Sequence, residues 1–143
     1  MNVEYTVAID AKPEKVWAIL YDVERWPEWT QSMSKVEVLD QPLAVGSRVK
    51  IKQPKLMAAT MTVFSLEEDR SFSWRAKSPG LHTEAHHDIS SSESGTSVTL
   101  RFELTGAFAG VAGVFWGSMI RRYVEMEGNG LKARAEAPQL GVR

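Results

Sequence analysis

The hydrophobic pattern of the chain changes its period once, and this change limits the folds that the chain can adopt. Between residues 36 and 105, apolar and polar residues alternate in short runs, which is typical of β-strands with one buried face. From Ala112 to about Glu136, apolar residues recur with the spacing of an α-helix. Because a half-buried sheet needs a cover, we expect an α+β fold in which this helix covers a curved antiparallel sheet.

Six alternating runs predict the strands of this region, and a seventh precedes them at the N-terminus. The predicted strands are 3–9, 36–38, 49–51, 60–66, 71–76, 81–89 and 97–105. Turn residues separate them, including Gly46, Pro79–Gly80 and the serine-rich stretch 90–95. The register from Met57 to Val63 stays open, because apolar residues fall on both faces of that stretch.

Two short helices are expected after the first strand. Pro13 suits the first position of a helix, and the apolar stripe that follows predicts a helix to about Tyr21. Asp22 and Glu24 begin a second short helix or turn, which Pro27 limits. At 143 residues the chain is most simply one domain over residues 1–137, followed by a flexible tail at 138–143.

The charge balance and the N-terminus exclude several classes of protein. The net charge of −1 and the absence of a Lys/Arg cluster argue against a nucleic-acid partner. The chain has no cysteine, which excludes disulfides, thiolate metal sites and a cysteine nucleophile. Acidic residues interrupt the N-terminus, and the longest uncharged run, 104–120, is too short to span a membrane. We therefore expect a cytoplasmic protein without membrane insertion.

Five segments carry a resemblance to a known superfamily. They are PEKVWAILYDVERWPEW, VGSRVKIKQP, LEEDRSFSW, SGTSVTLRFELTG and RRYVEMEGNGLKARAE. In this order they resemble the Bet v 1-like, START-related (SRPBCC) superfamily, and its bacterial polyketide cyclase/dehydrase and lipid-transport branch most of all. The resemblance implies a helix-grip fold, in which a curved seven-stranded antiparallel sheet wraps round the long C-terminal helix and encloses an apolar cavity.

The stretch WPEW follows the first helix, and in the implied fold this turn lies at one end of the cavity. Trp26 would then pack against the sheet as a plug, and Trp29 would stand nearer the mouth. Alternation turns strand residues inward, and the C-terminal helix would meet them. The predicted ligand-binding residues are Trp29, Phe72, Trp74, His87, Phe102, Phe115, Met119 and Tyr123. Such an aromatic and methionine-lined interior suits a flat or greasy ligand, and no cofactor is expected.

Three histidines lie on one predicted strand. His82 and His86 would stand about 13 Å apart there, too far to share one metal ion, so no metal site is expected. If Ile89 faces the core, His87 faces it too, either as a structural histidine or as a group that binds or protonates a ligand. His87, Tyr123 and Thr62 are the candidate catalytic residues.

Glu127 falls within the apolar half of the C-terminal helix, where a buried carboxylate would need a partner. The simpler interpretation is that the helix end rises clear of the sheet. Glu127 and Arg134 would then both be solvated.

Three functions stay open, and whether the protein is an enzyme stays open with them. The first is binding of a lipid, polyketide or aromatic metabolite in the cavity. The second is a cyclase, aromatase or dehydratase; the resemblance implies an inward arginine and hydroxyl on a middle strand, yet strand 60–66 has no arginine. The third is a protein-interaction module or homodimer, which an exposed apolar patch would support. That patch would consist of Phe108, Val111, Val114 and Trp116.

Overall fold

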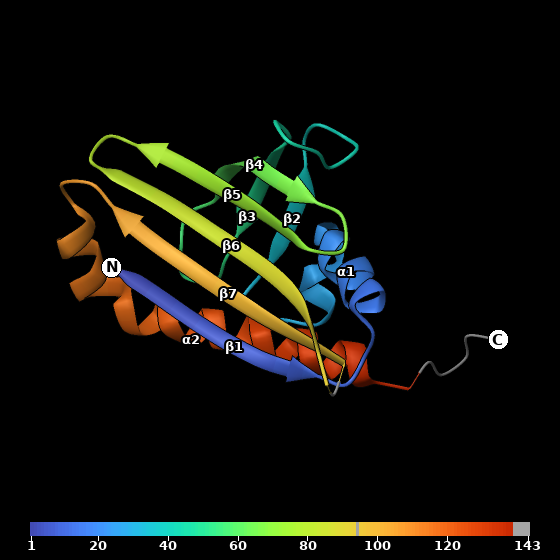
Figure 1. Cartoon of the computed structure of the whole chain (residues 1–143). Helices are drawn as coiled ribbons and strands as arrows, with labels where there is room; N and C mark the ends of the chain where they lie inside the picture. Colours follow the sequence, from blue (N-terminus) through green and yellow to red (C-terminus); the bar gives the residue numbers. More distant parts are fainter. Residues whose placement is uncertain (94, 139–143) are drawn as a thin grey trace.

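A seven-stranded antiparallel sheet curls around one long helix (Figure 1). This computed structural model describes residues 1–93 and 95–138. The strands are β1 (Asn2–Ile9), β2 (Lys35–Val38), β3 (Arg48–Lys52), β4 (Ala59–Glu67), β5 (Ser71–Ser78), β6 (Leu81–Ser92) and β7 (Gly95–Thr105). Their order in the sheet is β1-β7-β6-β5-β4-β3-β2, so the first strand pairs with the last. The predicted α+β helix-grip fold is confirmed, while the tail beyond Pro138 lies outside the described residues.

The helices are those that the pattern predicts. They are α1 (Pro13–Tyr21), the 3₁₀-helix η1 (Val23–Glu28) and α2 (Ala109–Glu136), which begins three residues earlier than expected. Pro13 opens α1, where its missing N–H costs no hydrogen bond. Both short helices lie together near one end of the sheet (Figure 1).

Alternation determines which side chains reach the inner face of the sheet. Phe72 and Trp74 on β5 are buried there, as is His87 on β6. The structure also determines the register that the sequence left open. Met61 and Val63 point inward, which leaves Thr62 on the outer face, paired with Arg48 on one side and Arg75 on the other. The inner face of β4 is therefore apolar.

The C-terminal half of α2 approaches its neighbours closely because glycines lie at the contacts. A Cβ atom at Gly128 would lie 2.8 Å from Cδ2 of Tyr5 on β1, and one at Gly130 would overlap the carbonyl oxygen of Trp29. The N-terminal half of α2 instead carries exposed apolar side chains. Ala109 and Ala112 of that half are nevertheless buried against Leu104, so α2 contacts the sheet near both ends and leaves space beneath its middle.

We expect Gly130→Ala to lower the free energy of unfolding by about 1–3 kcal/mol, because the new methyl group overlaps backbone that cannot rotate away. Gly110→Ala on the same helix is the matched control, since a Cβ atom there meets nothing within 4 Å. The higher helix propensity of alanine should leave this control at least as stable as the wild type. Urea unfolding measures both variants, and equal stabilities would contradict the close approach of α2.

Candidate functional site

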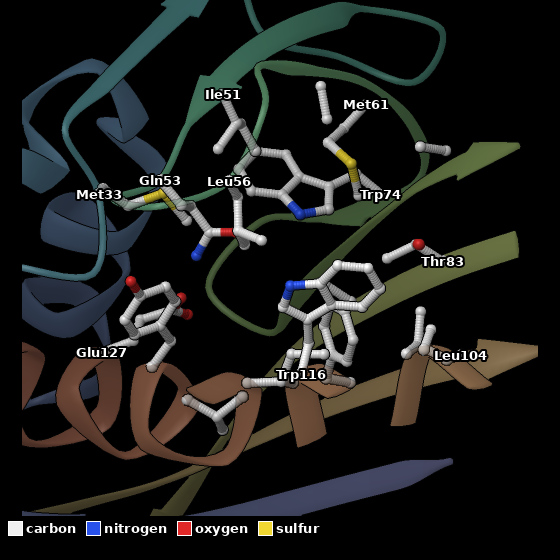
Figure 2. Close-up of a pocket in the computed structure, with 18 of the residues that line it drawn as sticks. Met33, Ile51, Gln53, Leu56, Met61, Trp74, Thr83, Leu104, Trp116 and Glu127 are labelled. Carbon is white, nitrogen blue, oxygen red and sulfur yellow. The ribbon is translucent and has the colours of Figure 1, made fainter. Parts of the chain in front are cut away.

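A cavity of about 370 Å³ lies between α2 and the inner face of the sheet (Figure 2). This volume falls within the range of about 300–1,000 Å³ that is typical of small-molecule sites. Its wall is mostly apolar and includes Ile51, Leu56, Met61, Trp74, Phe102 and Trp116. Polar side chains reach it at five positions, namely Gln53, Thr83, His87, Tyr123 and Glu127. The composition fits a largely apolar ligand that carries a few polar atoms.

The cavity opens between α2 and the segment that connects β3 to β4. Met57 on that segment is 90% exposed and Trp116 on α2 is 44% exposed, yet both line the cavity. At the other end His87 and Met33 are buried, so this end is closed. The patch predicted on Phe108, Val111, Val114 and Trp116 is indeed exposed. A ligand would therefore enter past exposed apolar side chains.

The two tryptophans of WPEW occupy different places. Trp26 is fully buried, donates from Nε1 to the carbonyl oxygen of Leu20 at 2.9 Å, and packs against Trp74 and His87 with ring centroids 5.4 Å away. Trp26 therefore packs against the sheet, as the resemblance implies. Trp29 packs behind Trp26 and does not line the cavity. Its Nε1 is buried without a hydrogen-bond partner among the described residues.

His87 and Glu127 form a buried pair at the closed end. Their side chains are 3% and 13% exposed, and Nε2 of His87 lies 3.4 Å from a carboxylate oxygen of Glu127. The prediction that Glu127 would be solvated is wrong, because the C-terminal half of α2 stays against the sheet instead of rising from it. Arg134 is not its partner either, since it donates to Glu28 at 2.8 Å. That guanidinium holds the pKa of the Glu28 carboxyl below its usual range.

Neighbouring contacts fix the orientation of the His87 ring. Phe72 stacks on it with centroids 4.2 Å apart and an interplanar angle of 16°. Nδ1 of His87 lies 3.0 Å from the carbonyl oxygen of Phe72. Because a carbonyl can only accept, Nδ1 carries a hydrogen and Nε2 faces Glu127.

Tyr123 joins α2 to the segment beneath the opening. Its hydroxyl donates to the carbonyl oxygen of Pro54 at 2.6 Å. One residue earlier, the amide of Gln53 donates to the carbonyl oxygen of Ser32 at 3.2 Å. The first bond holds the β3–β4 connection against α2, and the second ties it to the connection between η1 and β2.

The structure places the remaining predicted site residues as follows. Trp74, His87, Phe102 and Tyr123 line the cavity together, as expected. Phe72 is buried behind His87 and supports it rather than reaching the cavity. Phe115 is 74% exposed, and neither it nor half-buried Met119 lines the cavity. Thr62 lies on the outer face, away from His87 and Tyr123, which corrects its expected place in the interior.

A second group of titratable residues lies on the outer face of the sheet. Glu84, His86 and Glu103 bring their ligand atoms within 4.8 Å of one another. Both ring nitrogens of His86 already face protein partners, Oγ of Ser73 at 2.9 Å and a carboxylate oxygen of Glu84 at 3.1 Å. Arg101 also donates to Glu103 at 2.9 Å. These bonds account for the cluster as an outer-face polar network.

Several lining residues could not be recognised from periodicity. Met33, Gln53, Leu56 and Met57 lie in connections between strands, where no repeating pattern exists. Glu127 did carry a signal, namely a charge within the apolar half of a helix. No helix in the described part of the chain is long and apolar enough to cross a membrane.

Comparison with solved structures supports the fold. A hypothetical protein of Helicobacter pylori superposes with a TM-score of 0.82 at 15% identity, covering 95% of this chain and 88% of its own. A START superfamily protein of Mycobacterium smegmatis gives 0.77 at 15% identity, covering 94% and 97%. A Streptomyces aromatase/cyclase gives 0.71 at 22% identity, covering 95% and 93%. At these identities the likeness concerns the fold alone.

Comparison with curated proteins finds no match. The family model described as "Polyketide cyclase / dehydrase and lipid transport" matches residues 1–136, which is nearly the whole chain. Together with the helix-grip fold and the cavity under α2, this match shows that the chain belongs to the polyketide cyclase/dehydrase and lipid-transport family.

Proposed function

We propose that the protein binds a hydrophobic small molecule, of lipid, polyketide or aromatic type, in the cavity between the sheet and α2. The observation that carries this proposal is an apolar cavity of about 370 Å³ with one buried polar pair at its closed end. Apolar walls favour burial of a hydrophobic ligand, and the few polar groups orient it. The exposed side chains of Met57 and Trp116 provide an apolar entrance.

The pair of His87 and Glu127 gives the ligand a defined polar contact. Nδ1 of His87 already donates to the carbonyl oxygen of Phe72, so Nε2 is the ring nitrogen that faces Glu127, 3.4 Å from a carboxylate oxygen. A ligand oxygen near the pair can accept or donate a hydrogen bond without any rearrangement of the wall.

The same pair supports a second candidate function, general acid–base catalysis of the cyclase, aromatase or dehydratase kind. A carboxylate or a neutral imidazole at the cavity wall can remove a proton from carbon next to a carbonyl, and its conjugate acid can return one to oxygen. Incubation of 2-acetylnaphthalene in D₂O tests this function, because enolisation replaces the methyl protons by deuterium. If the wild type speeds the exchange of the methyl protons and Glu127→Gln abolishes this effect, the protein is an enzyme. If the exchange proceeds at the rate seen in buffer alone, the result favours a binding protein.

A protein-interaction role, including a homodimer, rests on the exposed apolar side chains of α2. Native mass spectrometry of the protein purified from its own host separates the alternatives. A retained molecule of a few hundred daltons supports ligand carriage. A ligand-free mass at twice the monomer weight favours protein interaction.

We expect Ala85→Phe to abolish binding of the fluorescent hydrophobic probe N-phenyl-1-naphthylamine, because the added ring fills the cavity that Ala85 lines. Asp88→Phe is the matched control, since it adds the same ring to the exposed outer face of the same strand. Fluorescence titration gives the two dissociation constants. If Ala85→Phe leaves the dissociation constant unchanged, the probe binds outside the cavity, and this would contradict the proposed function.

We expect Glu127→Leu to lower the free energy of unfolding by about 1–3 kcal/mol, because it leaves Nε2 of His87 facing an apolar side chain. Glu127→Gln should cost less than about 1 kcal/mol, since its amide N–H can donate to Nε2 in place of the lost contact. Urea unfolding of both variants measures the difference. Equal losses would show that the pair makes no specific contact.

A further inference from the structure

One indole N–H on the cavity wall has no acceptor among the described residues. Trp74 is 2% exposed and lines the cavity, and no described residue accepts a hydrogen bond from its Nε1. Trp26, in contrast, donates its N–H to the carbonyl oxygen of Leu20. Nε1 of Trp74 is not among the fully buried polar atoms that lack a partner, so it borders the open space of the cavity, where a bound molecule can accept its hydrogen bond.

The N–H of Trp74 is directed into the cavity. Figure 2 shows the indole nitrogen on the side of the ring turned towards Trp116, which stands on the opposite wall. No described residue accepts a hydrogen bond from Nε1 of Trp116 either, although this side chain also reaches solvent. Two donor-only groups from β5 and α2 thus line one space.

The surroundings restrict what can accept these hydrogen bonds. Met61 and Ala76 beside Trp74 are apolar, as are Ala85 and Phe102 on the next two strands. An indole N–H can only donate, so the complementary ligand atom must be an acceptor. A carboxylate or phosphate would lose its hydration in this apolar space, at high cost. A neutral oxygen avoids that cost.

We infer that the ligand is a flat, neutral molecule whose carbonyl-type oxygen accepts a hydrogen bond from Nε1 of Trp74. This inference rests on the proposed function and adds the chemical class of the ligand. Aromatic ketones, quinones and conjugated esters belong to this class, whereas hydrocarbons, alkyl amines and free fatty acids do not. The indole rings of Trp74 and Trp116 lie on opposite sides of the cavity and give it aromatic walls, which suit a flat molecule.

The test compares two probes of equal shape, 2-acetylnaphthalene and 2-isopropenylnaphthalene, in which a CH₂ group replaces the carbonyl oxygen. Isothermal titration calorimetry gives their dissociation constants for wild type and for Trp74→Phe, which keeps an aromatic ring but removes the N–H. We expect Trp74→Phe to weaken binding of the ketone about 3- to 10-fold more than binding of the alkene, as one neutral hydrogen bond predicts.

Trp17→Phe is the matched control, because Trp17 is a buried tryptophan that packs on Phe72 but does not line the cavity. It should leave the ratio of the two dissociation constants unchanged. If both probes bind the wild type and Trp74→Phe changes both affinities equally, the inference is overturned and the proposed function stands. If neither probe binds the wild type, the proposed function fails and the inference fails with it.

A second measurement does not depend on the folding of any variant. The carbonyl stretch of ¹³C-labelled 2-acetylnaphthalene moves to lower frequency when its oxygen accepts a hydrogen bond. A bound frequency below that in dry alkane supports the inference. A frequency equal to that in alkane overturns it.

Discussion

The close contact between the C-terminal half of α2 and its neighbours determines the rest of the structure. Gly130 allows the helix to rest on the backbone of Trp29, and Gly128 allows it to rest on Tyr5. At the other end of the helix, Ala109 and Ala112 are buried against Leu104. The space that remains beneath α2 is the cavity, and the hydrogen bond from Tyr123 to Pro54 keeps the β3–β4 connection at its edge.

The polar groups of the cavity depend on the aromatic core behind them. Trp26 contacts Trp74 and His87, and Phe72 stacks on the His87 ring, so the core holds both rings in one orientation. The backbone of Phe72 also sets which nitrogen of His87 carries a hydrogen. Packing therefore decides where the polar atoms of the site lie, and the site requires little adjustment when a ligand arrives.

The sequence predicted the strands and most inward residues correctly, because each residue of a strand can face only the inner or the outer side of the sheet. It failed on α2, where a helical wheel gives relative angles but not the arc that faces the sheet. Phe115 and Met119 lie on the outer arc, whereas Trp116 and Glu127 lie on the inner one. The lining residues in connections, such as Gln53 and Leu56, follow from tertiary contacts that have no periodic signature.

The polar end of the cavity lies farthest from its opening, and this affects how fast a ligand exchanges. The oxygen atom must pass Met57 and Trp116 and lose its water before it reaches the buried groups at the closed end. In the transition state for entry, the ligand oxygen has lost its water but has not yet formed its final hydrogen bond. This raises the barrier in both directions, so it slows association and dissociation alike. Residence time would then respond to the size and polarity of the side chains at the opening, independently of the affinity set at the closed end.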